Sequence, residues 1–513
     1  MTIDSLRSSL RLPALTLFGA TVVPSAELPA YADACAAHGA PLVFMYGTDE
    51  RAAGIGFAVH AVFALPGSGF VTLRSVLPAE KPSYPSLTRT IMAAHWFERL
   101  MQDQFGIIAE GHPDPRRLIH HENVPEGTYP LRKDFAWDAK LPHADVPYPM
   151  HRVEGRGVYE IPVGPIHAGV IEPGHFRFNV RGERILSLEG KLFFTHKGVE
   201  KLVEGKTPAE ALPFIERISG DMPVAHTLAF AEAVERASCI SVPKRARMLR
   251  VVWSELERIT MHLFDMGNMG GNGTGFTFMA AQGFRMVEEM RRMHASLAGH
   301  RYLRGAVTPG GAHDLSQEAA AGMLRTLARI ERDMKDVLKI AYGTDGLMER
   351  FETTGVLSRA AALAYGARGI AARASGVDTD ARRDYPYAAY DELAVNVVTE
   401  KAGDVAARFK VRAREFEESL RLVRAALAAL PEGKAQAPAI AKEGAALAAV
   451  ESWRGTIYDW VRIGADGRID RAAISDPSFS NWPLFGEIGP GNIVPDFPLC
   501  NKSLNLSYSG TDL

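Results

Sequence analysis

Three long stretches in the second half of the chain repeat apolar residues every three or four positions. The first stripe comprises Met248, Val252, Leu256, Ile259 and Leu263. The second comprises Leu324, Leu327, Met334, Val337 and Leu338, and the third Phe409, Phe416, Leu420, Val423 and Leu427. This spacing places one apolar face along a helix of several turns. Because each face must be covered by another element, the sequence predicts the core helices of a bundle.

The first 145 residues show a different pattern, which predicts a small α/β domain. Segments 55–63 and 70–73 are apolar and predict strands. No formal charge occurs from residue 52 to 73, but the break Pro66–Gly69 argues against a membrane span. Residues 87–105 have helical spacing, and the proline-containing stretch 138–149 predicts a linker.

The rest of the chain, 146–513, predicts a larger and mostly helical domain with β hairpins, so that the expected fold class is α+β. A hairpin is indicated where residues 176–180 turn at Gly182 into residues 184–188. Residues 266–275 contain five glycines and two asparagines, which predict a loop between helices.

Charge and cysteine content exclude several classes of protein. The 513 residues carry a net charge of −2, whereas a nucleic-acid binder normally shows a basic excess. The three cysteines, Cys35, Cys239 and Cys500, are far apart and have no paired spacing. A disulfide framework and a Cys-x-x-Cys metal site are therefore not expected.

Several motifs in the first domain resemble the 30-kDa-type subunit of respiratory complex I. They are His95–Arg99, Asp103–Ile107, Gly111–Leu118 and Pro130–Phe135. The remaining chain resembles the large subunit shared by nickel–iron hydrogenases and the 49-kDa-type subunit of complex I. The motifs that carry this likeness are Gly164–Gly169, Glu172–Phe178, Thr195–Leu202, Val242–Arg247 and Val450–Gly455. Fusion of the two modules, 1–145 and 146–513, resembles the large subunit of formate-hydrogenlyase-type complexes.

The metal-binding cysteines of the hydrogenase family are missing. Residues 216–226 resemble the motif Arg-x-Cys-Gly-x-Cys-x-x-x-His, with Ser219 and Met222 in the cysteine positions. Ser507 and Gly510 occupy the two cysteine positions of the closing motif. A hydroxyl, a hydrogen atom and a thioether do not replace thiolates as ligands of nickel and iron. We therefore expect no metal site and no stoichiometric nickel in the purified protein.

Two residues are candidates for proton chemistry beside this position. Glu172 lies in a segment that resembles the Glu-Gly-His segment from which hydrogenases pass protons, and a buried carboxyl there could relay them. The alternative is a structural carboxylate that bonds loop amides. His226 matches the motif histidine and could donate to a ligand or move protons; the alternative is a plain helix-capping or core role. His167, His175 and His196 are expected to be architectural, and no cofactor-binding residue is assigned.

The resemblance implies a subunit of a membrane-attached, ion-translocating redox complex. Its expected partners are an iron–sulfur small subunit, which supplies electrons, and membrane antiporter-like subunits. The chain itself binds no cofactor in this interpretation, and a quinone is the candidate acceptor. In complex I a tyrosine near the first cysteine motif helps to bind the quinone, but residues 216–226 contain none. The alternatives are a non-catalytic coupling subunit and, less favoured, an active hydrogenase.

The resemblance also implies a location and an assembly. The expected place is the cytoplasmic face of the inner membrane, with peripheral attachment through partner subunits. Glu172, Ser219 and Ser507 should converge on one cavity, and the isolated chain should expose apolar surface near it. Hydrogenase large subunits are usually trimmed after the last motif, whereas three residues follow Gly510 here, so no trimming is expected.

Overall fold

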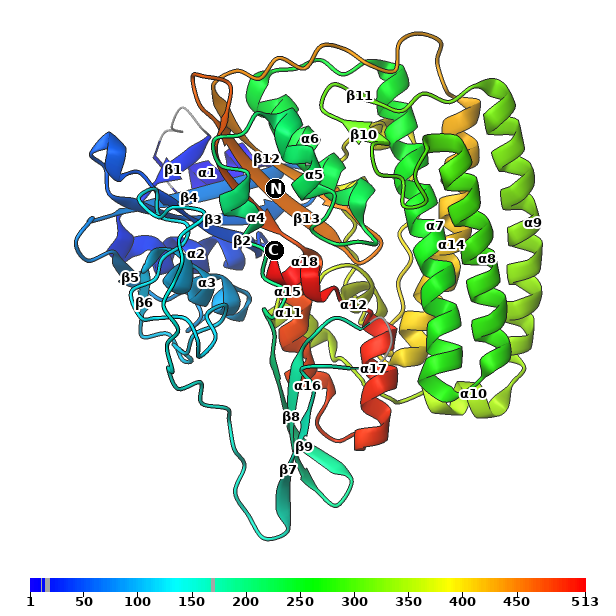
Figure 1. Cartoon of the computed structure of the whole chain (residues 1–513), viewed down its shortest axis with the longest axis horizontal. Helices are drawn as coiled ribbons and strands as arrows, with labels where there is room; N and C mark the ends of the chain where they lie inside the picture. The colour runs from blue at the N-terminus through cyan, green and yellow to red at the C-terminus, as the bar shows by residue number, and fades with distance from the viewer. Residues whose placement is uncertain (11, 14–18, 168–170) are drawn as a thin grey trace.

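The computed structural model describes residues 1–10, 12–13, 19–167 and 171–513. Part of the Gly164–Gly169 motif, Ala168 and Gly169, lies outside the described residues. The predicted α+β class is confirmed: a helical bundle lies at one side, a small α/β unit at the other, and a hairpin sheet projects between them (Figure 1).

The N-terminal unit is built on a four-stranded sheet with strand order β1-β4-β3-β2, in which only β1 and β4 run parallel. Its strands are β1 (Ala20–Val22), β2 (Leu42–Asp49), β3 (Phe57–Leu65) and β4 (Gly69–Leu77), with the separate parallel pair β5 (Ser83–Pro85) and β6 (Ile108–Glu110). Its helices are α1 (Ile3–Ser9), α2 (Leu28–Ala37) and α3 (His95–Phe105). The two predicted strands are confirmed as β3 and β4.

The helix predicted over residues 87–105 is shorter than expected. The backbone N–H of Leu87 and the hydroxyls of Ser86 and Thr88 all donate to the buried carboxylate of Glu98, at 2.6 to 2.7 Å. Because these groups donate to Glu98, residues 86–88 wrap around that side chain and cannot form the first turn of a helix. The α-helix therefore begins only at His95.

No helix or strand occurs from residue 138 to 157, in line with the predicted linker. The antiparallel sheet β7 (Val158–Val163), β8 (His175–Arg181) and β9 (Arg184–Lys191) follows, which confirms the predicted hairpin. A domain boundary at residue 145 stays a prediction, because one hydrophobic core joins Phe44 and Tyr46 of β2 to Tyr458 and Trp460 near the C-terminus.

Four long helices form the bundle: α7 (Lys244–Thr274), α8 (Thr277–Ala298), α9 (Gln317–Tyr342) and α14 (Val405–Ala428). They lie side by side in Figure 1 and pack through the predicted apolar stripes. Shorter elements surround them: α4 (Val199–Leu202), α5 (Pro208–Ile215), α6 (Pro223–Ser238), β10 (Val307–Thr308), β11 (Gly311–Ala312), α10 (Asp345–Phe351), α11 (Arg359–Ala364), α12 (Gly369–Ala374) and α13 (Ala381–Asp384).

The loop predicted over residues 266–275 is wrong, because α7 runs on to Thr274 and ends at Gly275, whose φ of +83° is left-handed. Three of these glycines, Gly267, Gly270 and Gly271, face α8. A Cβ at Gly271 would lie 2.2 Å from Cβ of Ala280, and one at Gly267 would lie 3.2 Å from Cα of Gly283. These three glycines allow two helices to approach closely, and only Gly275 ends α7.

The C-terminal part returns to a sheet and short helices. Strands β12 (Gly444–Glu451), β13 (Thr456–Ile463) and β14 (Ile469–Ser475) form an antiparallel sheet. The helices that follow are α15 (Pro477–Asn481), α16 (Phe485–Ile488), α17 (Phe497–Leu504) and α18 (Tyr508–Asp512), none of which the sequence pattern predicted.

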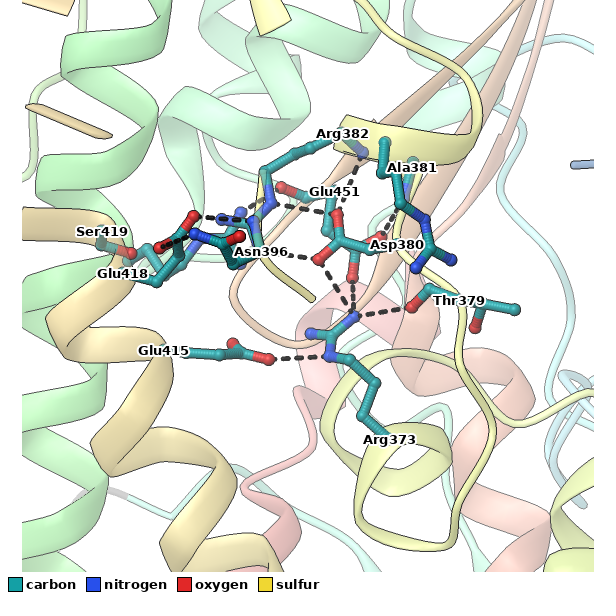
Figure 2. Close-up of polar contacts among 12 residues, drawn as sticks. Arg373, Thr379, Asp380, Ala381, Arg382, Asn396, Glu415, Glu418, Ser419 and Glu451 are labelled. Atoms are coloured by element: carbon teal, nitrogen blue, oxygen red, sulfur yellow. Dashed lines mark hydrogen bonds and ion pairs between the residues drawn. The ribbon is translucent and has the colours of Figure 1, made fainter. Parts of the chain in front are cut away.

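A buried network of charges joins the bundle to this sheet. Arg373 of α12 donates to Glu415 of α14 and to Glu451 of β12, both at 2.7 Å, as Figure 2 shows. Arg382 and Asp380 continue the network toward α13 (Figure 2). Each charge is fully buried, so the loss of one partner would leave another without compensation.

Candidate functional site

The two serines in cysteine positions lie together, although 288 residues separate them. The hydroxyl oxygens of Ser219 and Ser507 are 2.8 Å apart. Ser219 also donates to Asp221 at 2.8 Å, and Ser507 caps α18 by accepting the N–H of Gly510 at 2.9 Å. The two side chains therefore satisfy one another and their neighbours.

The other two cysteine positions, Met222 and Gly510, place no metal-binding atom beside these serines. Met222 is fully buried in an apolar cluster with Met261 and Trp453. At Gly510 a Cβ would lie 2.5 Å from Oδ2 of Asp476 and 2.9 Å from Oγ of Ser507. The residues present do not fit a nickel–iron centre. In the described part of the chain, no three His, Cys, Asp or Glu side chains group as metal ligands.

A cavity of about 980 Å³ opens beside the serine pair. Its wall includes Glu172, Ser219 and Ser507, so the predicted convergence of these three residues is confirmed. The cavity is a meeting point of loops and helices: the chain before β8, the turn before α6, the facing sides of α7 and α8, and residues 501–509.

Glu172 stands on the cavity wall and is held there by the backbone. Its Oε2 accepts the N–H of Ser509 at 2.9 Å, which ties the loop before β8 to the start of α18. Lys197 lies close by and donates to the carbonyls of Ile218 and Ser509 at 3.3 and 3.2 Å. Burial lowers the pKa of Lys197, while the negative charge of Glu172 opposes this effect.

His226 is fully buried and does not belong to the cavity wall. Its Nε2 lies 3.0 Å from Oδ2 of Asp476. This oxygen is the atom that leaves no room for a side chain at Gly510. Burial alone would raise the pKa of Asp476, but the hydrogen bond to His226 and the charges of His226 and Arg454 outweigh it and lower this pKa. The structure thus places His226 in a second layer behind the serines.

An ion pair on the cavity wall, with a buried arginine and a half-buried aspartate, was missed by the sequence interpretation. Arg454 donates two parallel hydrogen bonds to Asp221, at 2.7 and 2.8 Å, and its guanidinium lies 3.9 Å from the centre of the Trp453 ring. Burial alone would raise the pKa of Asp221, but the charge of Arg454 outweighs it and lowers this pKa. The only signal was that both residues fall in the matched segments 216–226 and 450–455.

Two tyrosines also line the cavity, although the motif 216–226 contains none. Tyr302 comes from the loop after α8, and Tyr508 follows Ser507 directly. Burial raises the pKa of Tyr508 to about 12, which keeps its hydroxyl protonated and able to donate. The side chains of His167, His175 and His196 contact the backbone carbonyls of Gly174, Gly164 and Asp512, respectively, in line with architectural roles.

Comparison with known proteins yields three family matches. The model of the respiratory-chain NADH dehydrogenase 30 Kd subunit matches residues 21–140, and that of the 49 Kd subunit matches residues 273–443. The model of nickel-dependent hydrogenase matches residues 197–266.

Similar whole proteins span nearly the full chain. Formate hydrogenlyase subunit 5 and hydrogenase-4 component G of Escherichia coli (strain K12) are each 32% identical over 489 residues. These alignments cover 92% and 93% of this chain and 84% of each relative. The carbon monoxide-induced hydrogenase of Rhodospirillum rubrum is 29% identical over 69% of this chain and 99% of its own length.

Proposed function

The chain belongs to the family of large subunits that includes formate hydrogenlyase subunit 5, hydrogenase-4 component G and the fused C/D-type chains of NADH-quinone oxidoreductase, and from this premise we propose that it is a redox subunit of a membrane-attached, complex-I-related complex. The observation that carries the proposal is the cavity, which keeps an acidic, a cationic and a phenolic group on its wall although the metal ligands are absent.

In this proposal an organic acceptor in the cavity receives electrons from an iron–sulfur cluster that a small partner protein holds. A quinone suits this chemistry, because two electrons and two protons convert its two carbonyls into hydroxyls without a metal. Tyr302 and Tyr508 supply hydroxyl donors for a carbonyl oxygen, and the side chains of Met261 and Phe264 supply an apolar wall.

Glu172 is the residue that we assign to proton supply. It reaches the cavity, and the amide of Ser509 fixes its position. Glu172 can hold the loop and also relay protons, because the hydrogen bond from the amide of Ser509 occupies only one of its two carboxylate oxygens. His226 would act from behind the cavity wall through Asp476, without touching the acceptor.

A second function, conformational coupling without chemistry, is favoured by one observation. Ser219, Ser507, Asp221 and Arg454 satisfy one another through hydrogen bonds, so this part of the site is stable without a bound molecule. An active hydrogenase is disfavoured by the poor fit of Met222 and Gly510 to a metal centre. Stoichiometric nickel in an elemental analysis of the purified complex would reverse that judgement.

The relatives are subunits of multi-subunit complexes, so partners are part of this family's function. We assign an iron–sulfur small subunit and membrane antiporter-like subunits as those partners. The cytoplasmic face of the inner membrane is the assigned place. Attachment through partners agrees with the described residues, in which no helix has the length and apolar character needed to cross a bilayer.

The test compares quinone reduction by the purified complex with that of two variants. Glu172→Gln removes the titratable carboxyl and keeps its size, so turnover should fall at least about 100-fold, the usual contribution of a general acid. Glu349→Gln, on an exposed position of α10, is the matched control and should keep full activity. Both complexes should assemble normally. No quinone reduction in the intact wild-type complex would favour the coupling function.

A further inference from the structure

The side chains that line the cavity fall into two chemically different sets. One is apolar and comes from the facing sides of α7 and α8, with Met261, Phe264, Phe284 and Val287. The rings of Phe264 and Phe284 pack with centroids 5.3 Å apart. Such a surface accepts the flat or apolar body of an organic molecule.

The other set consists of three cations that lack a counter-ion among the described residues. Arg291 near the end of α8, Arg304 in the following loop and Lys502 in α17 all line the cavity. Within the described ranges, none of these side chains forms a hydrogen bond or an ion pair. The Nε atoms of Arg291 and Arg304 are buried from solvent and have no partner there. Arg291 lies over the ring of Tyr302, with its guanidinium carbon 4.8 Å from the ring centre.

The carboxylates of the cavity do not neutralise these cations. Asp221 is engaged by Arg454, and Glu288 by Arg292 and Arg301. Glu172 is thus the one cavity carboxylate without a basic side chain bonded to it in the described structure. The cavity therefore carries surplus positive charge beside its apolar side chains. The two buried Nε–H groups are costly to leave without an acceptor, which an anion in the cavity would supply.

We propose that the cavity binds a small aromatic or apolar organic anion. Its carboxylate or phosphate meets Arg291 and Arg304, and its body packs against Phe264 and Phe284. This inference rests on the proposed function, because it names the chemical class of the acceptor: an aromatic molecule that carries an oxyanion group. A guanidinium matches both oxyanions, since its donors lie in a planar fork. Lys502 adds a third, point-like charge to the lining of the cavity.

The probes for this site share a naphthalene ring and differ in the polar group attached to it. Binding of 2-naphthoate, 2-naphthyl phosphate and the neutral 2-naphthamide to the purified complex can be measured by calorimetry. At low salt, at least one of the two anions should bind about tenfold or more tightly than the amide, because charged hydrogen bonds are the stronger ones. The two anions show whether the site prefers a carboxylate or a phosphate.

Two variants locate the site. Arg304→Gln alone, and together with Arg291→Gln, should remove most of the preference for the anion and leave amide binding unchanged. Arg332→Gln is the control, because Arg332 is an exposed arginine on α9 away from the cavity. Equal binding of anions and amide by wild type, or an unchanged preference in the double variant, would overturn the proposal.

Failure of the anion site and failure of the proposed redox function give different results. If wild type shows no anion preference and the double variant instead loses one of its partner proteins on purification, the arginines face a protein and the inference is wrong. If the anion binds as expected but no quinone is reduced, the acceptor assignment and the proposed redox function fail, while the anion site stands. Circular dichroism of each variant verifies that it is folded.

Discussion

Ser507 shows how one hydroxyl can join two distant segments of the candidate site. It caps α18 and bonds to Ser219, so two segments far apart in sequence are joined without a metal. At Gly510 the space that a side chain needs is filled by Asp476. Restoring cysteines at all four positions would therefore require Asp476 to move, and it would also break the hydrogen bond from His226.

Glu257 carries a pH-dependent contribution to stability. Burial raises the pKa of this carboxyl to about 8, and the negative charge of Asp221 adds to the shift, although the N–H groups of Val224 and Ala225 oppose it. Between the ordinary value of 4.5 and this value, the folded chain holds a proton that the unfolded chain has released. Stability must then fall as pH rises through this window, by at most about 1.4 kcal/mol per pH unit.

The Glu257→Gln variant should remove this fall. Its midpoint of urea denaturation, relative to wild type, should increase steadily between about pH 5 and pH 8. A constant offset is expected as well, because a glutamine NH₂ group cannot accept from Val224 or Ala225. The change with pH of the difference between the two urea midpoints is therefore the quantity to measure. Glu349→Gln, an exposed control, should follow wild type, and parallel curves for all three proteins would contradict the prediction.

At the residue scale, sequence motifs predicted which segments meet at the cavity but not which charges there are paired. Glu172, Ser219 and Ser507 were found because each lies in a short motif that can be matched on its own. The pair Asp221–Arg454 and the uncompensated Arg291 and Arg304 could not be found in this way. Whether a charge has a partner depends on which distant segments the fold brings together, and no local pattern records it.

At the scale of elements, the contact between α7 and α8 depends on the absence of side chains. Gly271→Ala would place a methyl group 2.2 Å from Cβ of Ala280, so the helices would have to separate. We expect the variant to lose about 1–3 kcal/mol through overpacking, although alanine has the better helix propensity. The apolar wall of the cavity lies on the same two helices, so ligand binding should weaken as well.

The control is Gly322 in α9, where the nearest atom to an added Cβ is the flexible Nη2 of Arg325, 3.7 Å away. Gly322→Ala should stabilise the protein by up to about 1 kcal/mol. Opposite changes in the melting temperature of the two variants are the expected result. If both variants are stabilised, the close approach of α7 and α8 does not limit the bundle.

The same elements show why sequence patterns succeed and fail. The three apolar stripes predicted α7, α9 and α14, because a periodic face is visible in the sequence alone. The glycines at 266–275 were misread as a loop, since glycine ends a helix in isolation but allows close packing beside another helix. The short helices α15 to α18 have too few turns to show a period.

At the scale of the whole molecule, the N-terminal unit is held to the rest by a packed interface. The rings of Tyr46 and Trp460 stack with centroids 4.7 Å apart, and Lys133 pairs with Glu204 at 3.1 Å. The covalent connection, by contrast, runs through an exposed stretch at residues 138–143. Fragments 1–141 and 142–513, when co-expressed, should therefore associate and purify together.

Two substitutions in the fragments test the basis of that association. Trp460→Ala removes the large ring at the interface and should reduce co-purification strongly, since buried tryptophans dominate such contacts. Trp137→Ala is the control, because that tryptophan is 72% exposed near the linker. Fragments that fail to associate even with Trp460 in place would show that the linker itself is needed for folding.

The exposed linker has a consequence for assembly. A peptide connection between two surfaces that already fit adds no contact; it raises the effective concentration of one unit near the other. Both halves of the molecule are then made in equal number and meet before either encounters a competing surface. The benefit of the fusion is thus kinetic and stoichiometric. Once the interface has formed, the linker could be lengthened at little cost in free energy, because the entropy of loop closure grows only slowly with length.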